Sequence, residues 1–202
     1  MNTYKLHSYL GYLLILPVIL WALTGALFLL KPGYKNAYEQ LQLTNYPLNS
    51  TLPLSPEPHW QAIAINRTLL GSHYRVKIDN KWQHINPLSN QKLSEPDPQS
   101  MLNLLQDAVK HNPQRYGLVL NYKDGTAYTD TKVKLMFDWS QLSIRQQGAD
   151  SRIFNTFYDI HYLRWTGNKI VDQWFGYVGL GLLVLMALTG IIMLKKAVTK
   201  TP

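Results

Sequence analysis

Two histidines, His7 and His161, are the side chains of this sequence best suited to bind a metal or a flat cofactor. His7 stands in YKLHSYLG, and His161 stands in DIHYLRWTG among aromatic residues and an arginine. Gly11 follows His7 by four residues, and Gly167 follows His161 by six. Imidazole is the commonest metal ligand, and glycine lets helix backbones approach closely. The pattern therefore suits a cofactor held between helices.

The phrase ALTG occurs twice, at residues 22–25 and 187–190, once in each long apolar run. Its small residues give a helix face on which another helix or a flat molecule can pack closely. The alternative is that both histidines are interfacial side chains and that both phrases serve simple helix packing. We favour the cofactor interpretation because a histidine and an ALTG phrase accompany both runs.

The elements that must position these residues are two uncharged runs, residues 9–30 and 174–194. Each is about long enough to cross the ~30 Å hydrocarbon core of a bilayer at ~1.5 Å per residue. The first run is longer than the ~7–15 residues of a signal-peptide core, and no small-x-small cleavage site follows it. We expect an uncleaved span, in which Pro17 is tolerated because lipid-embedded helices accept proline.

Lysines near the ends of the chain predict the orientation. They are Lys5 before the first span and Lys195, Lys196 and Lys200 after the second. Lys31 and Lys35 begin a long connecting domain, where charges count for less. We expect both termini in the cytoplasm and the central domain outside.

The central region has the patterns of a small α+β domain. SPEPHWQAIAINRTLLG, with Ser55 as N-cap, and DPQSMLNLLQDAVKH, starting at Asp97 or Pro98, predict helices. Hairpins are predicted around Asp79-Asn80 and Asp124-Gly125. KVKLMFDWS and LSIRQQG predict a further antiparallel pair. An antiparallel sheet with helices on one face is the expected result.

Composition excludes several classes of site. The chain has 202 residues, a formal net charge of +8 and no cysteine, so disulfides, zinc-thiolate sites and cysteine-ligated iron–sulfur clusters are excluded. It contains no Gly-rich phosphate loop and no nucleophile elbow, and its basic residues need no nucleic-acid partner. The other histidines match no ligand spacing and are interpreted as scattered surface side chains; they are His59, His73, His84 and His111.

The segment before the second span predicts an amphipathic helix in the outer interface, because Ile153, Phe157 and Ile160 recur at helical spacing. The expected order is a cytoplasmic N-terminus (1–8), a first span (9–30), a central domain (31–150), this interfacial helix (151–171), a second span (172–194) and a cytoplasmic tail (195–202).

Both ends of the chain resemble one known family. YKLHSYLGYLLILPVILWALTGALFLL resembles the opening helix of the PepSY-associated transmembrane family, and DIHYLRWTGNKIVDQWFGYVGLGLLVLMALTGIIML resembles its leucine–histidine element and following helix. The domain between them fits a PepSY-like periplasmic domain, so the resemblance covers essentially the whole chain. Ile160 stands where leucine is usual, and two spans replace the four or more of larger relatives. The two-span form is similar to VciB-type iron-acquisition membrane proteins.

The resemblance implies haem b bound by His7 and His161, because larger relatives include ferric reductases that carry b-type haem on histidines. Two imidazoles on one iron bring their nitrogens within about 4–5 Å, since metal–nitrogen bonds are ~2 Å. The expected topology separates these two residues by the ~30 Å bilayer. A two-fold homodimer, in which each histidine meets its own copy, resolves this conflict. It forms a four-helix membrane bundle with two haems.

The implied function is that of a ferric reductase of the bacterial inner membrane. Electrons from quinol or a cytoplasmic donor would reduce ferric iron or a ferric chelate outside, supplying Fe(II) to a ferrous iron transporter. No catalytic residue is assigned. Arg164 and Arg152 are expected to pair with haem propionates, with interfacial anchoring as the alternative, and Gly11 and Trp165 to lie against the haem.

Two other function classes stay open. One is a haem-free regulatory or binding protein that acts through its periplasmic domain. The other is an accessory subunit of a divalent-metal transporter.

Overall fold

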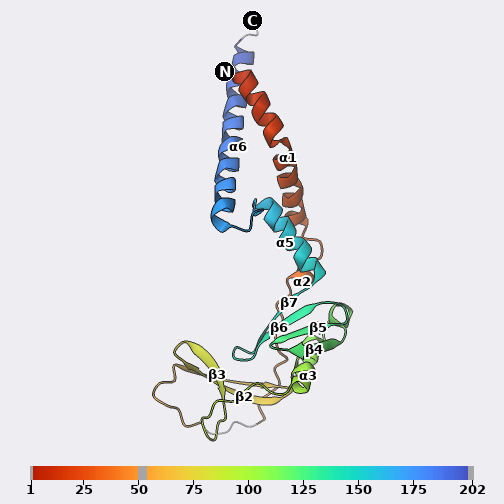
Figure 1. Ribbon diagram of the computed structural model, residues 1–202, viewed down its shortest axis with the longest axis vertical. Helices are drawn as coiled ribbons and strands as arrows, with labels where there is room; N and C mark the ends of the chain where they lie inside the picture. Colours follow the sequence, from red (N-terminus) through yellow and green to blue (C-terminus); the bar gives the residue numbers. More distant parts are fainter. Residues whose placement is uncertain (1, 50–53, 200–202) are drawn as a thin grey trace. The chain divides into compact units, whose positions relative to one another are not determined.

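The computed structural model describes residues 2–49 and 54–199, which form two compact units. The first unit joins the two ends of the chain, residues 1–34 and 152–202, and the second is residues 35–151. Figure 1 labels most of the elements of both units. Lys200, one of the lysines that predict the orientation, lies outside the described residues.

Three helices build the first unit: α1 (Thr3–Leu30), α5 (Ala149–His161), whose first three residues belong to the second unit, and α6 (Lys169–Val198). Helix α1 has 28 residues and α6 has 30. At ~1.5 Å per residue both exceed the ~30 Å thickness of a bilayer core. The side chain of Asn2 caps α1 by accepting the N–H of Tyr4, and that of Asn168 caps α6 by accepting the N–H of Ile170.

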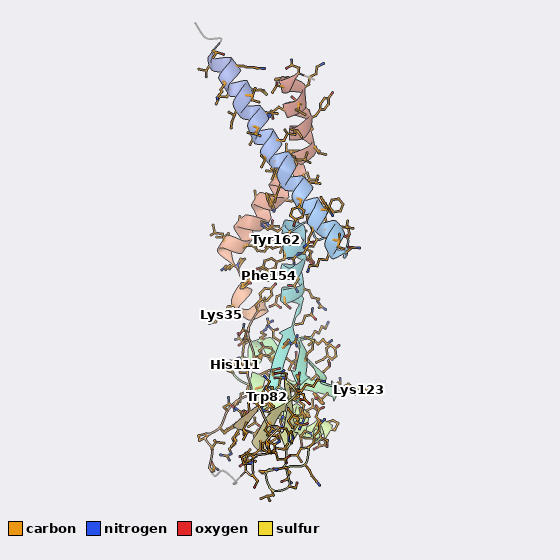
Figure 2. The ribbon with its side chains drawn as sticks, turned by 90° about the vertical axis from the view of Figure 1, so that its left-hand side faces the viewer. Lys35, Trp82, His111, Lys123, Phe154 and Tyr162 are labelled. Atoms are coloured by element: carbon orange, nitrogen blue, oxygen red, sulfur yellow. The ribbon has the colours of Figure 1, made fainter. Side chains whose placement is uncertain are left out.

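Helices α1 and α6 run antiparallel, with the start of α1 beside the end of α6 (Figure 1). Most of their side chains project outward, as Figure 2 shows. The buried residues are Leu10, Leu14 and Thr24 on α1, and Asp172 and Thr189 on α6. A core helix of a soluble protein would bury its apolar side chains, whereas these two helices expose theirs along most of their length. Surfaces of this kind are compatible with lipid.

Helix α5 is shorter than the interfacial helix predicted over 151–171, because it ends at His161 and residues 162–168 form a loop. Leu163 and Gly167 have positive φ angles of 54° and 72°, which a continuing right-handed helix does not allow. Asp172 holds this loop, since its Oδ1 accepts hydrogen bonds from the backbone N–H (3.0 Å) and hydroxyl (2.8 Å) of Thr166. In Figure 2, Tyr162 lies at the end of α5 nearer to α6 than Phe154.

The second unit contains two antiparallel sheets and short helices. The three-stranded sheet has β1 (Ala62–Thr68), β2 (Gly71–Ile78) and β3 (Lys81–Ile85) in that order. The four-stranded sheet has β4 (Val119–Lys123), β5 (Thr126–Thr129), β6 (Lys134–Asp138) and β7 (Ser143–Gln147). The helices are α2 (Tyr34–Ala37), which begins at the last residue of the first unit, α3 (Pro98–Val109) and α4 (Pro113–Tyr116).

The α+β class is confirmed, and so are the elements with strong local signals. Asp79 and Asn80 both have positive φ angles, 48° and 62°, as a tight hairpin between twisted strands requires. Asp124 and Gly125 do the same between β4 and β5, at 47° and 72°. Helix α3 begins at the predicted place, where the side chain of Asp97 accepts two backbone N–H groups at 3.0 Å.

The helix predicted from Ser55 is wrong. Residues 62–68 form strand β1, which pairs with β2 from Ala62 opposite Lys77 to Thr68 opposite Gly71. Isoleucines at alternate positions of AIAINRT suit a pleated surface better than a helix. The cues at Ser55 act only over a few residues, whereas pairing with β2 satisfies the whole backbone of the segment.

The larger core of this unit lies between α3 and the four-stranded sheet. Its fully buried side chains include Met101, Leu104 and Leu105 from α3 and Leu135 from β6. A smaller core, Tyr74, Val76 and Ile85, belongs to the three-stranded sheet. The domain therefore has two sheets, each with its own apolar cluster, where a single sheet was predicted.

Candidate functional site

His7 on α1 contacts the ALTG segment of α6. Its Nδ1 atom lies 2.9 Å from Oγ1 of Thr189, a side chain that is only 4% exposed. A methyl group at Gly190 would lie 3.4 Å from Cε1 of His7, which is an ordinary van der Waals distance, so the ring packs beside the helix backbone at this glycine.

His161, the last residue of α5, makes the matching contact with the ALTG segment of α1. Its Nδ1 lies 2.8 Å from Oγ1 of Thr24, which is 5% exposed. A methyl group at Gly25 would lie 3.9 Å from Cε1 of His161. The two repeated phrases therefore make the same contact near the two ends of the helix pair. In each, the threonine hydroxyl lies within hydrogen-bond distance of a histidine from the other end of the chain.

The two histidine contacts are far apart. Along α1, His7 and Thr24 are separated by roughly 25 Å at ~1.5 Å per residue. Two imidazoles that bind the same metal ion must lie much closer than this. Within one chain the histidines thus belong to two sites, one near each end of the helix pair.

The His161 site is an apolar cavity of about 160 Å³ between α1, α6 and the end of α5. Pro17 and Trp21 line it from α1, and Gly176 and Gly179 line it from α6. The indole N–H of Trp21 donates a 2.6 Å hydrogen bond to the backbone carbonyl of His161. Because that bond ties the end of α5 to α1, the histidine is held at the cavity wall.

Aromatic rings surround the imidazole of His161. The ring centroid lies 5.7 Å from that of Trp21, 5.1 Å from that of Phe28 and 5.2 Å from that of Tyr162. His7 instead borders an open groove of about 390 Å³ that is also lined by Gly11 and Met186. In the part of the chain that the structure describes, no hydrogen-bond partner is found for Nε2 of either histidine. One held nitrogen and one free nitrogen is the arrangement of a metal-ligating imidazole.

Residues 4–201 match the family model described as PepSY-associated TM region. The chain belongs to this family. No curated protein and no solved structure gives a significant match. Membership of the PepSY-associated transmembrane family, together with the exposed apolar surfaces of α1 and α6, identifies a membrane protein.

Of the other four predicted site residues, the glycine and the tryptophan line the spaces beside the histidines, whereas the two arginines line neither space. Gly11 borders the His7 groove, and Trp165 lines the cavity at His161, so both lie next to the expected histidine. The Arg164 guanidinium lies 5.0 Å from the ring centroid of Tyr162 and borders a separate polar hollow.

Arg152 does not lie beside either histidine site. It is exposed on α5, roughly 13 Å along the helix from His161 at ~1.5 Å per residue. It lines neither the His161 cavity nor the His7 groove.

Sequence reasoning missed Thr24 and Thr189, the direct partners of the two histidines. The signal was present, because both threonines occupy the same place in the repeated ALTG phrase. The phrase was interpreted only as a face of small residues for close packing, and the threonine hydroxyl was not considered as a hydrogen-bond partner for histidine.

Two histidines of the central domain are buried, which corrects the prediction that all four lie on the surface. His73 is 6% exposed and His84 is 2% exposed. Nε2 of His73 lies 2.6 Å from Oγ1 of Thr68, and the Nε2–H of His84 donates to the carbonyl of Trp139 at 2.8 Å. The ring of His84 also stacks on that of Trp139 with centroids 3.9 Å apart.

Burial makes both of these histidines poor bases. It lowers the pKa of His73 to about 4, and the nearby positive charge of Arg75 adds to the effect. Burial also lowers the pKa of His84 to about 4, although the bond to the Trp139 carbonyl opposes the shift. Both rings are therefore neutral at pH 7.

The remaining histidines, His59 and His111, are exposed and lie 3.6 Å from Glu57 and 2.7 Å from Glu39. Among the residues that the structure describes, no group of three or more His, Cys, Asp or Glu side chains comes together as a metal site.

Proposed function

We propose that this protein is a haem-b oxidoreductase of the bacterial inner membrane that passes electrons across the bilayer and reduces Fe(III) to Fe(II) for ferrous iron uptake. One observation carries the proposal. At each end of the helix pair a histidine has Nδ1 engaged by a threonine, and its Nε2 has no partner among the described residues.

The residues around both histidines fit a haem. A haem needs imidazole nitrogens for its iron, flat apolar surfaces for its macrocycle and close approach of the backbone. His161 has Trp21 and Trp165 beside a cavity that is lined almost entirely by apolar side chains. His7 has Gly11 one turn away on an apolar helix face. Among the residues that the structure describes, none of those that line either space is Asp, Glu, Lys or Arg.

A second copy of the chain would complete each site. The cavity at His161 holds about 160 Å³, whereas sites for ligands of ordinary cofactor size have about 300–1,000 Å³. His7 and His161 cannot meet within one chain, as the separation of roughly 25 Å along α1 shows. In a two-fold dimer each histidine meets its own copy. The outward apolar surfaces of α1 and α6 supply the contact between copies.

Haem b, when bound, supplies one-electron chemistry. The chain holds the imidazoles at two depths, excludes water with apolar side chains, and anchors the end of α5 through the Trp21 hydrogen bond. Each Fe(III) takes up one electron and leaves as Fe(II). The electron comes from quinol, which releases two electrons and two protons on oxidation, or from a cytoplasmic reductant. The cytoplasmic side is proposed from Lys5, Lys195 and Lys196.

The deciding experiment is an absorption spectrum of the full chain purified in detergent, oxidised and then reduced with dithionite. We expect a Soret band that shifts on reduction. His7→Ala and His161→Ala should each remove about half of it, because a two-haem dimer has two independent sites. His59→Ala, at an exposed histidine of the central domain, should change nothing. Absence of the band, or a band unchanged in both variants, overturns the proposal.

The ferric reductase activity needs a second assay. Protein in liposomes that enclose a reductant is given an external ferric chelate and a chromogenic Fe(II) chelator. We expect colour formation that both histidine variants abolish. A colourless protein that holds a protein partner tightly would instead indicate a regulatory module. Iron uptake that falls on deletion but survives loss of both histidines would indicate an accessory subunit.

A further inference from the structure

We propose that Thr24 and Thr189 are positioning residues, which keep His161 and His7 protonated on Nδ1 so that Nε2 presents its lone pair. What Nε2 binds rests on the proposed function. The tautomer itself is a property of this chain alone and is testable without any cofactor.

The hydrogen bonds around the threonines set the direction of proton donation. Oγ1 of Thr24 lies 2.7 Å from the carbonyl of Leu20, and Oγ1 of Thr189 lies 2.8 Å from the carbonyl of Met186. A hydroxyl has one proton, and a carbonyl oxygen can only accept. When each hydroxyl donates to its own helix, its oxygen can only accept from the histidine. In the neutral imidazole the single ring proton must then be on Nδ1, which leaves Nε2 unprotonated.

Burial makes this arrangement hard to replace. Thr24 and Thr189 are 5% and 4% exposed, so water is not at hand to take over a lost hydrogen bond. A buried polar group without a partner is strongly unfavourable, because it has lost its hydrogen bonds to water and gained none in return. Each threonine therefore favours the Nδ1–H tautomer over the alternative, in which the hydroxyl would turn away from its own carbonyl.

The two contacts also couple the sites to the pairing of the helices. Helix α1 carries His7 and Thr24, while α5 and α6 carry His161 and Thr189. A one-residue slip of a helix moves a side chain by ~1.5 Å along the axis and turns it by about 100°. Such a slip of α1 would break both histidine–threonine contacts, which are 2.9 Å and 2.8 Å long, and a slip of α6 would break the His7–Thr189 contact. Both imidazoles are therefore correctly oriented only when α1 is in register with both α5 and α6.

A bound haem would report the same contacts. A partner on the second ring nitrogen fixes the ring plane and raises the basicity of the ligating nitrogen, and its loss typically costs 10–100-fold in metal affinity. We expect Thr24→Val and Thr189→Val to raise the haem dissociation constant by that factor at the affected site. Thr24→Ser and Thr189→Ser keep the hydroxyl and should stay within about twofold.

The first test needs no haem. The full chain, labelled with ¹⁵N at histidine and freed of haem, is studied by NMR in detergent micelles, where the shifts of the two ring nitrogens report the tautomer. His7→Gln and His161→Gln assign the signals. We expect Nδ1–H at both residues in the unmodified chain and in the serine variants. Thr24→Val should disturb His161 alone, and Thr189→Val should disturb His7 alone.

Thr156→Val is the matched control. Thr156 is also a helical threonine whose hydroxyl donates to a backbone carbonyl, that of Arg152 at 3.1 Å, but it contacts neither histidine. It should leave both histidine signals unchanged.

The second test measures transfer of haem from the loaded protein to an excess of a haem-free acceptor. The proposal is overturned if the haem-free chain carries its proton on Nε2, or if the valine variants alter neither the tautomer nor haem retention. A threonine-dependent Nδ1–H tautomer in a chain that binds no haem would instead sustain the positioning role and refute the proposed function.

Discussion

Acidification should destabilise the central domain through His73 and His84. Both are buried in the folded domain, where their pKa is lowered to about 4, whereas an unfolded histidine titrates near 6.5. The unfolded chain therefore binds more protons than the folded one between these two values. The contribution of the two neutral histidines to the free energy of unfolding is therefore fully present above about pH 6.5, and it is lost progressively as the pH falls towards 4.

The size of the effect follows from the two pKa values. At pH 4.5, linkage gives a loss of about 2–3 kcal/mol for each histidine, or about 5 kcal/mol for the pair relative to pH 7.5. This is a large part of the ~5–15 kcal/mol that stabilises a typical domain. Asp150 has its pKa lowered chiefly by the hydrogen bond from Arg115, so it loses its contribution only at lower pH. Burial raises the pKa of Glu95, so protonation of this carboxyl on acidification favours the folded domain and offsets part of the loss.

The loss should begin where the two sheets meet. His84 on β3 stacks on Trp139, which follows β6, and donates to its carbonyl. Arg75 on β2 donates to the carbonyl of Gln141 at 2.7 Å, so its positive charge lies in the same region. A proton on either histidine adds a buried positive charge near that of the partly buried Arg75, and separation of the sheets relieves the repulsion.

Hydrogen exchange measured by mass spectrometry on the full chain in detergent, between pH 7.5 and 4.5, tests this reasoning. After correction for intrinsic exchange, peptides covering β2, β3 and residues 134–147 should lose protection as the pH falls. The double variant His73→Gln/His84→Gln cannot titrate and should give a flat profile. His59→Gln, at an exposed histidine, should behave like the unmodified chain. Protection that is independent of pH, or an equal loss in the double variant, refutes the argument.

Three further predictions concern the stability of the same domain, each read from the urea midpoint of tryptophan fluorescence. Leu105→Ala should cost about 3 kcal/mol, because the side chain is fully buried beneath the four-stranded sheet; a cost below about 1 kcal/mol would mean that the core is not packed there. Arg115→Met should cost about 2 kcal/mol by leaving the partly exposed Asp150 without its 2.5 Å ion pair, and Asp150→Leu in the same chain should recover part of it. Gly117→Ala should cost about 2 kcal/mol, because φ is +54° and a methyl group would clash with the side chain of Asp130, so an unchanged midpoint would contradict this backbone geometry.

Local signals in the sequence predicted much of the fold. The two long helices follow from uncharged runs of spanning length, and α3 follows from the Asp97-Pro98 start. The hairpins follow from residues that tolerate positive φ, such as Asp124-Gly125. Each of these features depends on neighbours a few residues away, which is why a single sequence reveals them.

Two of the wrong predictions involve contacts between distant residues. Strand β1 was predicted as a helix because its backbone bonds lie on β2, beyond the reach of the cues at Ser55. His73 and His84 looked like surface side chains because their burial depends on Trp139, more than fifty residues along the chain.

The candidate site also combines features that local sequence determines with features that depend on contacts between distant residues. The amino-acid sequence by itself determined that two histidines and two ALTG phrases accompany two membrane helices, because composition and order suffice for that. Only the tertiary structure decided which phrase faces which histidine, with Thr24 and His161 137 positions apart and His7 and Thr189 182 apart. The physical reason is that α1 lies antiparallel to α6, which brings His7 to Thr189, while the end of α5 returns to α1 and brings His161 to Thr24.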